Sequence, residues 1–168
     1  MHVTFVRTAV PMLLVLTLGA LCFAAEQPSV PASSVPSIEG TYKLSSRKLT
    51  DGTVLKPPDI MGLQTYTKSY RNFNILNKNA AGTYDSLSIV STYTLTPTEY
   101  TETPLFSINV RGQDIRHDLS GQTQRAAVTM DAGRLQFQRP VEQRVTVFEG
   151  NGFTSTSANN VDVWEKVN

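Results

Sequence analysis

Side chains that could carry catalysis or hold a metal are few in this chain. Outside the N-terminal segment discussed below, one histidine, His117, and no cysteine are present. His117 precedes Asp118, but adjacent residues of a strand point to opposite faces, so the pair does not make a base with its orienting carboxylate. A zinc site needs several nitrogen or sulfur ligands, and no acidic cluster with calcium-binding spacing is present. We therefore expect no metal and no other cofactor.

Nucleophilic and acid–base catalysis find no support either. The chain has many hydroxyl groups but lacks a Gly-x-Ser-x-Gly elbow. Glu99 and Glu102 are three residues apart on an expected strand, so they face opposite ways. The Gly150–Gly152 segment fits a hairpin turn better than a phosphate-binding loop. No catalytic residue is predicted, although a cofactor-free isomerase or cyclase stays open because such enzymes need few ionisable groups.

Aromatic and arginine side chains are better candidates, for binding rather than for catalysis. Most aromatic residues on expected strands should pack in the core, and a few would line a cavity if one exists. Tyrosines are favoured because a buried phenol needs a hydrogen-bond partner, which a ligand can supply. The arginines could hold an acidic head group, although exposure to solvent is the simpler expectation for both. The predicted ligand-binding residues are Tyr42, Tyr66, Phe73, Tyr93, Phe106, Arg71 and Arg111.

The N-terminus reads as an export signal. Residues 1–24 combine the basic Arg7, an apolar stretch at 9–18 and small residues at Cys22 and Ala24, which favour cleavage after Ala24. The apolar stretch is shorter than the roughly 20 residues of a membrane-spanning helix. A lipoprotein acylated at Cys22 is the less favoured alternative, because the residues before Cys22 do not fit that signal. We expect a periplasmic or secreted protein.

Composition sets the domains and the partners. Residues 25–37 are rich in Pro, Ser and Ala and should form a flexible linker, leaving residues 38–168 as one domain. The sequence has 15 Lys+Arg and 14 Asp+Glu, and loss of Arg7 with the signal leaves no net charge. A neutral chain without a basic run offers no electrostatic case for nucleic acid. We expect a monomer with no membrane span once the signal is removed.

From Ile38 onward the apolar pattern has a period of two, which predicts strands. Gly, Asn and Asp clusters separate about ten short strands, as in a meander. Residues 40–44 and 161–167 alternate at the two ends, and pairing between them would close the sheet and remove both edges. The sequence therefore predicts an all-β, up-and-down antiparallel barrel of about 8–10 strands. A two-sheet sandwich fits the strand count almost as well. The expected strands are 40–47, 60–67, 70–76, 84–95, 99–110 (broken or bent at Pro104), 115–119, 124–130, 134–138, 143–149, 152–157 and 161–167.

The domain resembles the bacterial lipocalin-like domain proteins of the calycin superfamily. The similarity lies in residues 40–44, 51–68, 71–74, 118–123 and 163–166. Lipocalins carry Gly-x-Trp on the first strand, and a basic side chain of the last strand covers the aromatic ring at the barrel base. Here Tyr42 stands at the tryptophan position and Lys166 is the possible basic partner. The resemblance implies a barrel that holds a small apolar molecule.

These observations support three hypotheses about function. The first is an exported, non-catalytic barrel that binds a small hydrophobic or amphipathic molecule. The second is a secreted protein-interaction or inhibitor module that uses the barrel loops, which an exposed apolar patch near residues 54–61 would favour. The third is the cofactor-free isomerase or cyclase, which a deeply buried acid or tyrosine with a strongly shifted pKa would favour.

Overall fold

The computed structural model describes residues 35–119 and 121–167. The predicted signal at 1–24 and most of the predicted linker at 25–37 lie outside the described residues. The described part is made of strands: β1 (Gly40–Leu49), β2 (Val54–Leu55), β3 (Ile60–Tyr66), β4 (Tyr70–Lys78), β5 (Tyr84–Leu95), β6 (Glu99–Arg111), β7 (Asp114–Asp118), β8 (Gln124–Asp131), β9 (Arg134–Arg139), β10 (Arg144–Glu149), β11 (Gly152–Thr156) and β12 (Asn160–Lys166).

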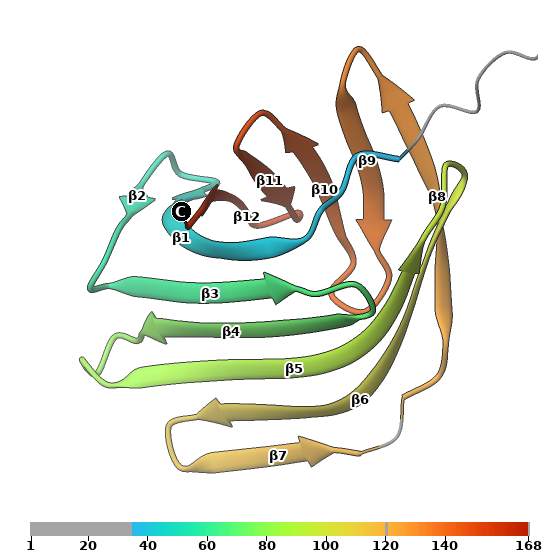
Figure 1. The fold of residues 1–168 in the computed structure, drawn as a ribbon. Coiled ribbons are helices and arrows are strands. Elements are labelled where there is room, and N and C mark those ends of the chain that lie inside the picture. Colours follow the sequence, from blue (N-terminus) through green and yellow to red (C-terminus); the bar gives the residue numbers. More distant parts are fainter. Residues whose placement is uncertain (1–34, 120, 168) are drawn as a thin grey trace, which may run out of the picture. The chain divides into compact units, whose positions relative to one another are not determined.

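Ten of these strands form a closed antiparallel barrel (Figure 1). The hydrogen-bonded order is β1, β3, β4, β5, β6, β8, β9, β10, β11 and β12, and β12 pairs back with β1. In this closing pair Tyr42 lies opposite Lys166 and Leu49 lies opposite Asn160. The predicted all-β barrel, closed by its first and last strands, is confirmed. The alternative of a two-sheet sandwich is wrong.

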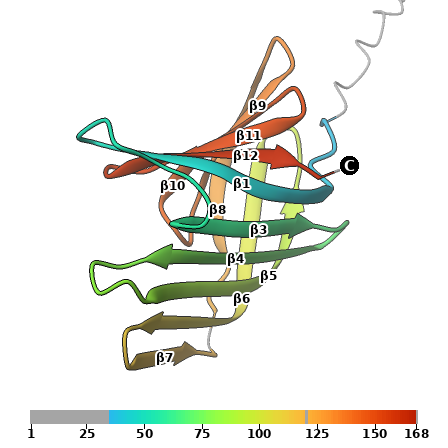
Figure 2. The same cartoon turned by 90° about the vertical axis from the view of Figure 1, so that its left-hand side faces the viewer.

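Two short strands stand outside the closed circuit. β2 pairs with β1, and β7 pairs with the second half of β6 (Figure 2). The sequence predicts residues 115–119 as one strand of the meander, but β7 has no second neighbour among the described residues. The reason is the length of β6. Its first residues, Glu99–Glu102, pair with β8, and its second half extends beyond β8 and pairs with β7 instead.

A β-bulge in β6 decides which of its residues face the interior. Val90 of β5 pairs with Phe106 and Ser91 pairs with Pro104, so Leu105 is an extra residue. One extra residue shifts the inward and outward alternation. As a result Glu102 is fully buried, whereas Phe106 is exposed. The break or bend predicted at Pro104 is this bulge, through which β6 continues.

The barrel has two unlike ends. The end that carries residues 35–39 is filled by side chains, and we call it the closed end. There the Tyr42 hydroxyl donates a hydrogen bond to the Ile38 carbonyl at 3.1 Å, and the Lys166 ammonium lies 5.9 Å from the centre of the Tyr42 ring. The other end, which we call the open end, carries the loops 50–59, 79–83, 140–143 and 157–159.

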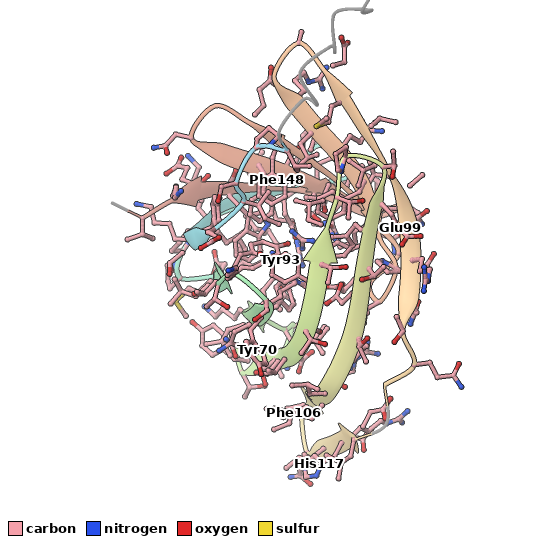
Figure 3. All side chains as sticks on the ribbon, turned by 45° about the vertical axis from the view of Figure 1, so that its right-hand side comes forward. Tyr70, Tyr93, Glu99, Phe106, His117 and Phe148 are labelled. Carbon is pink, nitrogen blue, oxygen red and sulfur yellow. The ribbon has the colours of Figure 1, made fainter. Side chains whose placement is uncertain are left out.

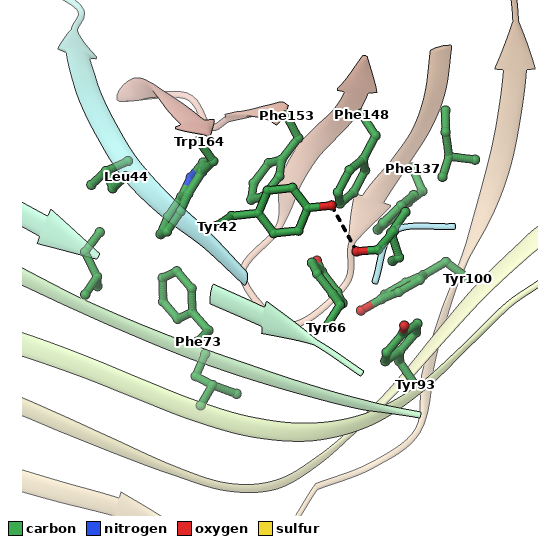
Figure 4. Packing of buried hydrophobic residues seen from close by; sticks show 14 of the residues in the cluster. Tyr42, Leu44, Tyr66, Phe73, Tyr93, Tyr100, Phe137, Phe148, Phe153 and Trp164 are labelled. Carbon is green, nitrogen blue, oxygen red and sulfur yellow. Dashed lines mark hydrogen bonds between the residues drawn. The ribbon is translucent and has the colours of Figure 1, made fainter. Parts of the chain in front are cut away.

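Aromatic rings fill the barrel from the closed end toward the middle (Figure 4). Neighbouring rings in this cluster have centroids between 4.2 and 6.3 Å apart, within the range of favourable aromatic pairs. Trp164 packs between Phe153 and Phe73. The cluster consists of Tyr42, Tyr66, Phe73, Tyr93, Tyr100, Phe137, Phe148, Phe153 and Trp164.

Gly62 makes room for the tryptophan. It lies on β3, and a Cβ atom there would be 2.8 Å from the Trp164 ring and 3.2 Å from the Asn74 carbonyl oxygen. Any larger residue would therefore push the indole out of its place in the core. The tight contact fixes Trp164 where the filled part of the barrel meets the open end.

Candidate functional site

Two arginines lie inside the barrel. Arg71 of β4 has no exposed surface and Arg139, the last residue of β9, is 1% exposed. A buried guanidinium is costly unless it is paired and hydrogen-bonded. The two arginines differ in this respect, and the difference defines the candidate site.

Arg71 is paired with two carboxylates. Its Nη1 donates to Glu102 Oε1 at 2.7 Å and to Glu142 Oε2 at 3.2 Å, and its Nη2 donates to Glu142 Oε1. Burial alone would favour the neutral form, but attraction to Glu142 and Glu102 prevails and raises the pKa of Arg71 well above its ordinary value. Arg71 therefore stays charged.

Glu102 and Glu142 are held differently. Glu102 comes from β6, is fully buried, and also accepts a hydrogen bond from the Tyr100 hydroxyl at 3.1 Å. Glu142 comes from the loop between β9 and β10, and its side chain is 9% exposed. Burial opposes the ionisation of Glu142, but attraction to Arg71 and Arg139 prevails and lowers the pKa of its carboxyl.

Arg139 has free donors. Its guanidinium carbon lies 5.0 Å from the centre of the Phe153 ring. Its Nε and Nη2 are buried and donate no hydrogen bond to any described residue. Since buried donors in native proteins are nearly always paired, an acceptor from water or from a ligand is expected at these two atoms.

Other polar side chains inside the barrel also lack partners. Within the described part of the chain they share two properties, which are burial and the absence of a hydrogen bond at the named atom. The concentration of such atoms in one interior is unusual for a folded domain. Besides Arg139, the atoms are Gln64 Nε2 and Oε1, Tyr66 OH, Arg71 Nε, Ser91 Oγ, Thr146 Oγ1 and Trp164 Nε1.

A cavity of about 430 Å³ opens at the open end and reaches Arg139. This volume lies within the range of small-molecule sites. Glu142 also lines the cavity, whereas Arg71 behind it does not. The apolar part of the wall consists of Phe73, Ile75, Leu87, Ile89, Val141 and Trp164.

The rim of the cavity is ordered by ion pairs. Arg47 donates to both carboxylate oxygens of Asp162, at 2.6 and 2.8 Å. Arg144 lies 3.1 Å from the same carboxylate and also donates to Ser155 and Asn160. Four arginines and three acids thus surround the cavity and its depth, with an excess of one positive charge. They are Arg47, Arg71, Arg139, Arg144, Glu102, Glu142 and Asp162.

Two further hollows lie on the outside of the wall. One, of about 740 Å³, is lined by residues of β9, β10, β11 and β12 and by Lys43, and the other, of about 380 Å³, lies over β3, β4 and β5. Neither has a fully buried charged side chain in its lining. We therefore take the cavity at the open end as the candidate site.

The structure places the predicted aromatic residues in different environments. Phe73 lines the cavity. Tyr66 lies deeper and has a hydroxyl without a partner. Tyr42 and Tyr93 are buried, but their hydroxyls donate to the carbonyls of Ile38 and Thr67. Phe106 points outward and is 37% exposed, directly before the part of β6 that pairs with β7 (Figure 3).

The two predicted arginines also separate. Arg71 belongs to the interior, so the expectation that it is exposed to solvent is wrong, because the inward face of β4 carries it between two carboxylates. Arg111 ends β6 and is exposed at the turn before β7, away from the cavity lining. The structure thus brings Arg71, Phe73 and Tyr66 together inside the barrel and leaves Arg111 and Phe106 outside.

Sequence reasoning missed the residues that define the site. The expected strand 134–138 stops one residue before Arg139, although Arg139 follows Leu135 and Phe137 in strict alternation and so shares their inward face. The same alternation puts Glu102 with Tyr100. No comparable signal exists for Glu142, because a loop residue has no period.

Residues 35–119 and 121–167 contain neither a cluster of metal ligands nor a membrane-spanning helix. No group of three His, Cys, Asp or Glu side chains there could hold a metal ion. No helix of that part is long and apolar enough to span a membrane. The closed barrel of ten antiparallel strands is consistent with a calycin-like fold. No protein-family model, curated protein or solved structure matches the chain.

Proposed function

We propose that this protein binds a small amphipathic molecule with an anionic head group in the cavity at the open end. The observation that carries the proposal is the combination of an apolar wall with Arg139, whose Nε and Nη2 have no partner. Two adjacent N–H donors of a guanidinium match the two oxygens of a carboxylate. The apolar tail of the ligand would lie against Phe73 and Leu87.

The electrostatics of the site favour binding over acid–base catalysis. A general acid or base works best with a pKa near the operating pH. Burial raises the pKa of Tyr66 and of Tyr100, and the neighbouring arginines lower the pKa of Glu142 against its burial. Each of these shifts moves the group further from neutral pH. The site therefore holds fixed charges and neutral phenols, which suit recognition.

The proposal includes the lipocalin-like character and the export of the chain. Gly40, Tyr42 and Lys166 at the closed end support the first, because Lys166 covers the Tyr42 ring as the resemblance implies. The pattern of residues 1–24 supports the second. In this proposal the mature protein is a periplasmic or secreted monomer.

The test is a titration followed by the fluorescence of Trp164, the only tryptophan and a cavity residue. Octanoate and octan-1-ol serve as probes with the same tail. We expect octanoate to bind the wild type, and Arg139→Met to weaken octanoate binding on the order of tenfold or more by removing a charged hydrogen bond. The binding of octan-1-ol should change little.

Arg134→Met provides the matched control, because Arg134 begins the same strand and is exposed at the closed end. It removes one positive charge from the surface and should leave octanoate binding unchanged. If Arg139→Met binds octanoate as tightly as the wild type, Arg139 is not the anchor and the proposal fails.

A further inference from the structure

The charges in the depth of the site balance before any ligand enters, because the excess positive charge of the cavity belongs to its rim, where Arg47 and Arg144 share Asp162. Arg71 and Arg139 face Glu102 and Glu142, two positive charges against two negative ones. An anionic head group that joined them would leave an uncompensated negative charge in a buried site, which is strongly unfavourable. A carboxylate ligand therefore needs one of the two glutamates to leave.

Glu142 is the carboxylate that can leave. Glu102 sits on a strand, is fully buried, and has both oxygens occupied, one by Arg71 and one by Tyr100. Glu142 sits on the loop between β9 and β10, lines the cavity and keeps some exposure. Rotation of its side chain toward the open end would return the carboxylate to water without disturbing a strand.

Arg71 keeps an ion-pair partner when Glu142 leaves. Its Nη1 keeps Glu102 Oε1 at 2.7 Å, so one ion pair persists after Glu142 leaves. Departure of Glu142 would free Nη2 of Arg71, while Nε and Nη2 of Arg139, the other arginine that attracts Glu142, already lack a partner among the described residues. This is a larger anion site than the one visible with Glu142 in place.

We propose that Glu142 is a built-in counter-ion that occupies the anion site in the empty barrel and is displaced by the head group of the ligand. This inference rests on the proposed function, since it assumes that an anionic ligand enters the cavity. It adds that the protein recognises a monoanion by exchanging it for its own carboxylate, which keeps the interior neutral.

The charged and titratable groups around Glu142 come from five strands. Those on β4, β9 and β10 are cationic, and those on β3 and β6 are phenols or the second carboxylate. All six groups lie on strands, whereas Glu142 itself lies on a loop. They are Arg71, Arg139, Arg144, Tyr66, Tyr100 and Glu102.

The first experiment compares Glu142→Gln with the wild type for octanoate, octane-1-sulfonate and octan-1-ol. Removing the competing carboxylate should tighten the binding of both anions on the order of tenfold and leave octan-1-ol unchanged. Glu149→Gln removes one carboxylate from the exposed end of β10 and should tighten neither anion. Equal anion affinity in Glu142→Gln and the wild type, with octan-1-ol bound by both, overturns the exchange but not the proposed function.

The second experiment uses the wild-type protein alone. Octane-1-sulfonate stays ionised in acid, so calorimetry near pH 4.5 in buffers of different ionisation enthalpy counts the protons taken up by the protein on binding. Displaced Glu142 returns to its ordinary pKa and should take up a fraction of a proton. Binding without proton uptake overturns the exchange. Failure of all three probes to bind overturns the proposed function itself, and the exchange with it.

Discussion

Arg71 shows how much of the interior is given to charge rather than to packing. Burial of a guanidinium and two carboxylates costs several kcal/mol per ion, which the mutual attraction offsets only with good geometry. Apolar residues of similar volume would stabilise a purely structural barrel at least as well. Stability alone therefore does not account for the triad of Arg71, Glu102 and Glu142, whereas the proposed recognition of an anionic ligand would.

We expect protonation of Glu142 to make the fold less stable in acid. The pKa of Glu142 is lower in the folded protein than its ordinary value of 4.5. Its contribution to stability is therefore fully present above about pH 4.5 and is lost as the pH falls through the lower native value. Urea unfolding should show Glu142→Gln about 1–2 kcal/mol less stable than the wild type at neutral pH.

The difference in unfolding free energy between the two proteins should shrink toward pH 3. Glu149→Gln, at the exposed end of β10, controls for the loss of a surface carboxylate. A gap between Glu142→Gln and the wild type that stays constant from neutral pH to pH 3 contradicts the ionisation of Glu142 as the cause.

Single residues are the level at which the sequence predicts least. Alternation places Phe73 and Tyr66 inside, and it could have placed Arg139 there as well. The expected strand 134–138 leaves Arg139 out, since Arg139 precedes a proline and arginine side chains are ordinarily exposed. The pairing of Arg71 with Glu142 joins residues 71 positions apart, and no local pattern encodes such a contact.

At the scale of elements, the strands follow from alternation and from the turn residues between them. The closing pair of β1 and β12 could be predicted because both strands alternate and an open sheet would expose its edges. The bulge in β6 and the separate course of β7 could not, because an inserted residue inverts the faces without leaving a signal in composition. Phe106 was misplaced for this reason.

β3 and β12, which are separated in the barrel wall only by β1, contact each other through Gly62 and Trp164. A methyl group at Gly62 would collide with the Trp164 ring, so Gly62→Ala should lower the free energy of unfolding by about 1–3 kcal/mol. Without the collision, alanine in a strand would be neutral or stabilising. Chemical denaturation of the purified variant measures the change.

A second substitution separates the collision from other effects of the new methyl group. Trp164→Phe shortens the ring that Gly62 faces, and in this background Gly62→Ala should cost at least about 1 kcal/mol less. Additive effects of the two substitutions would show that the close approach of Gly62 and Trp164 does not limit the packing.

As a whole, the barrel is filled with rings at the closed end and hollow at the open end. A ligand that binds only the folded protein raises its stability by mass action, about 2.7 kcal/mol at one hundred times the dissociation constant. Octanoate should therefore raise the Tm of the wild type by roughly 10 °C at that excess. The rise should be much smaller for Arg139→Met at the same octanoate concentration, and an equal rise in both proteins would point to binding elsewhere on the molecule.

If the proposed ligand binds, the indole of Trp164, which packs against Gly62 at the boundary between the filled and hollow parts, would also act as a depth stop. In the proposed binding mode, the tail of a head group held by Arg139 would lie among Phe73, Leu87 and the loops of the open end, and the aromatic cluster would block any extension toward the closed end. Chain length would then be measured from a fixed point, because short tails would be enclosed and each further methylene would extend into water. The barrel would sort its ligands by length as well as by charge.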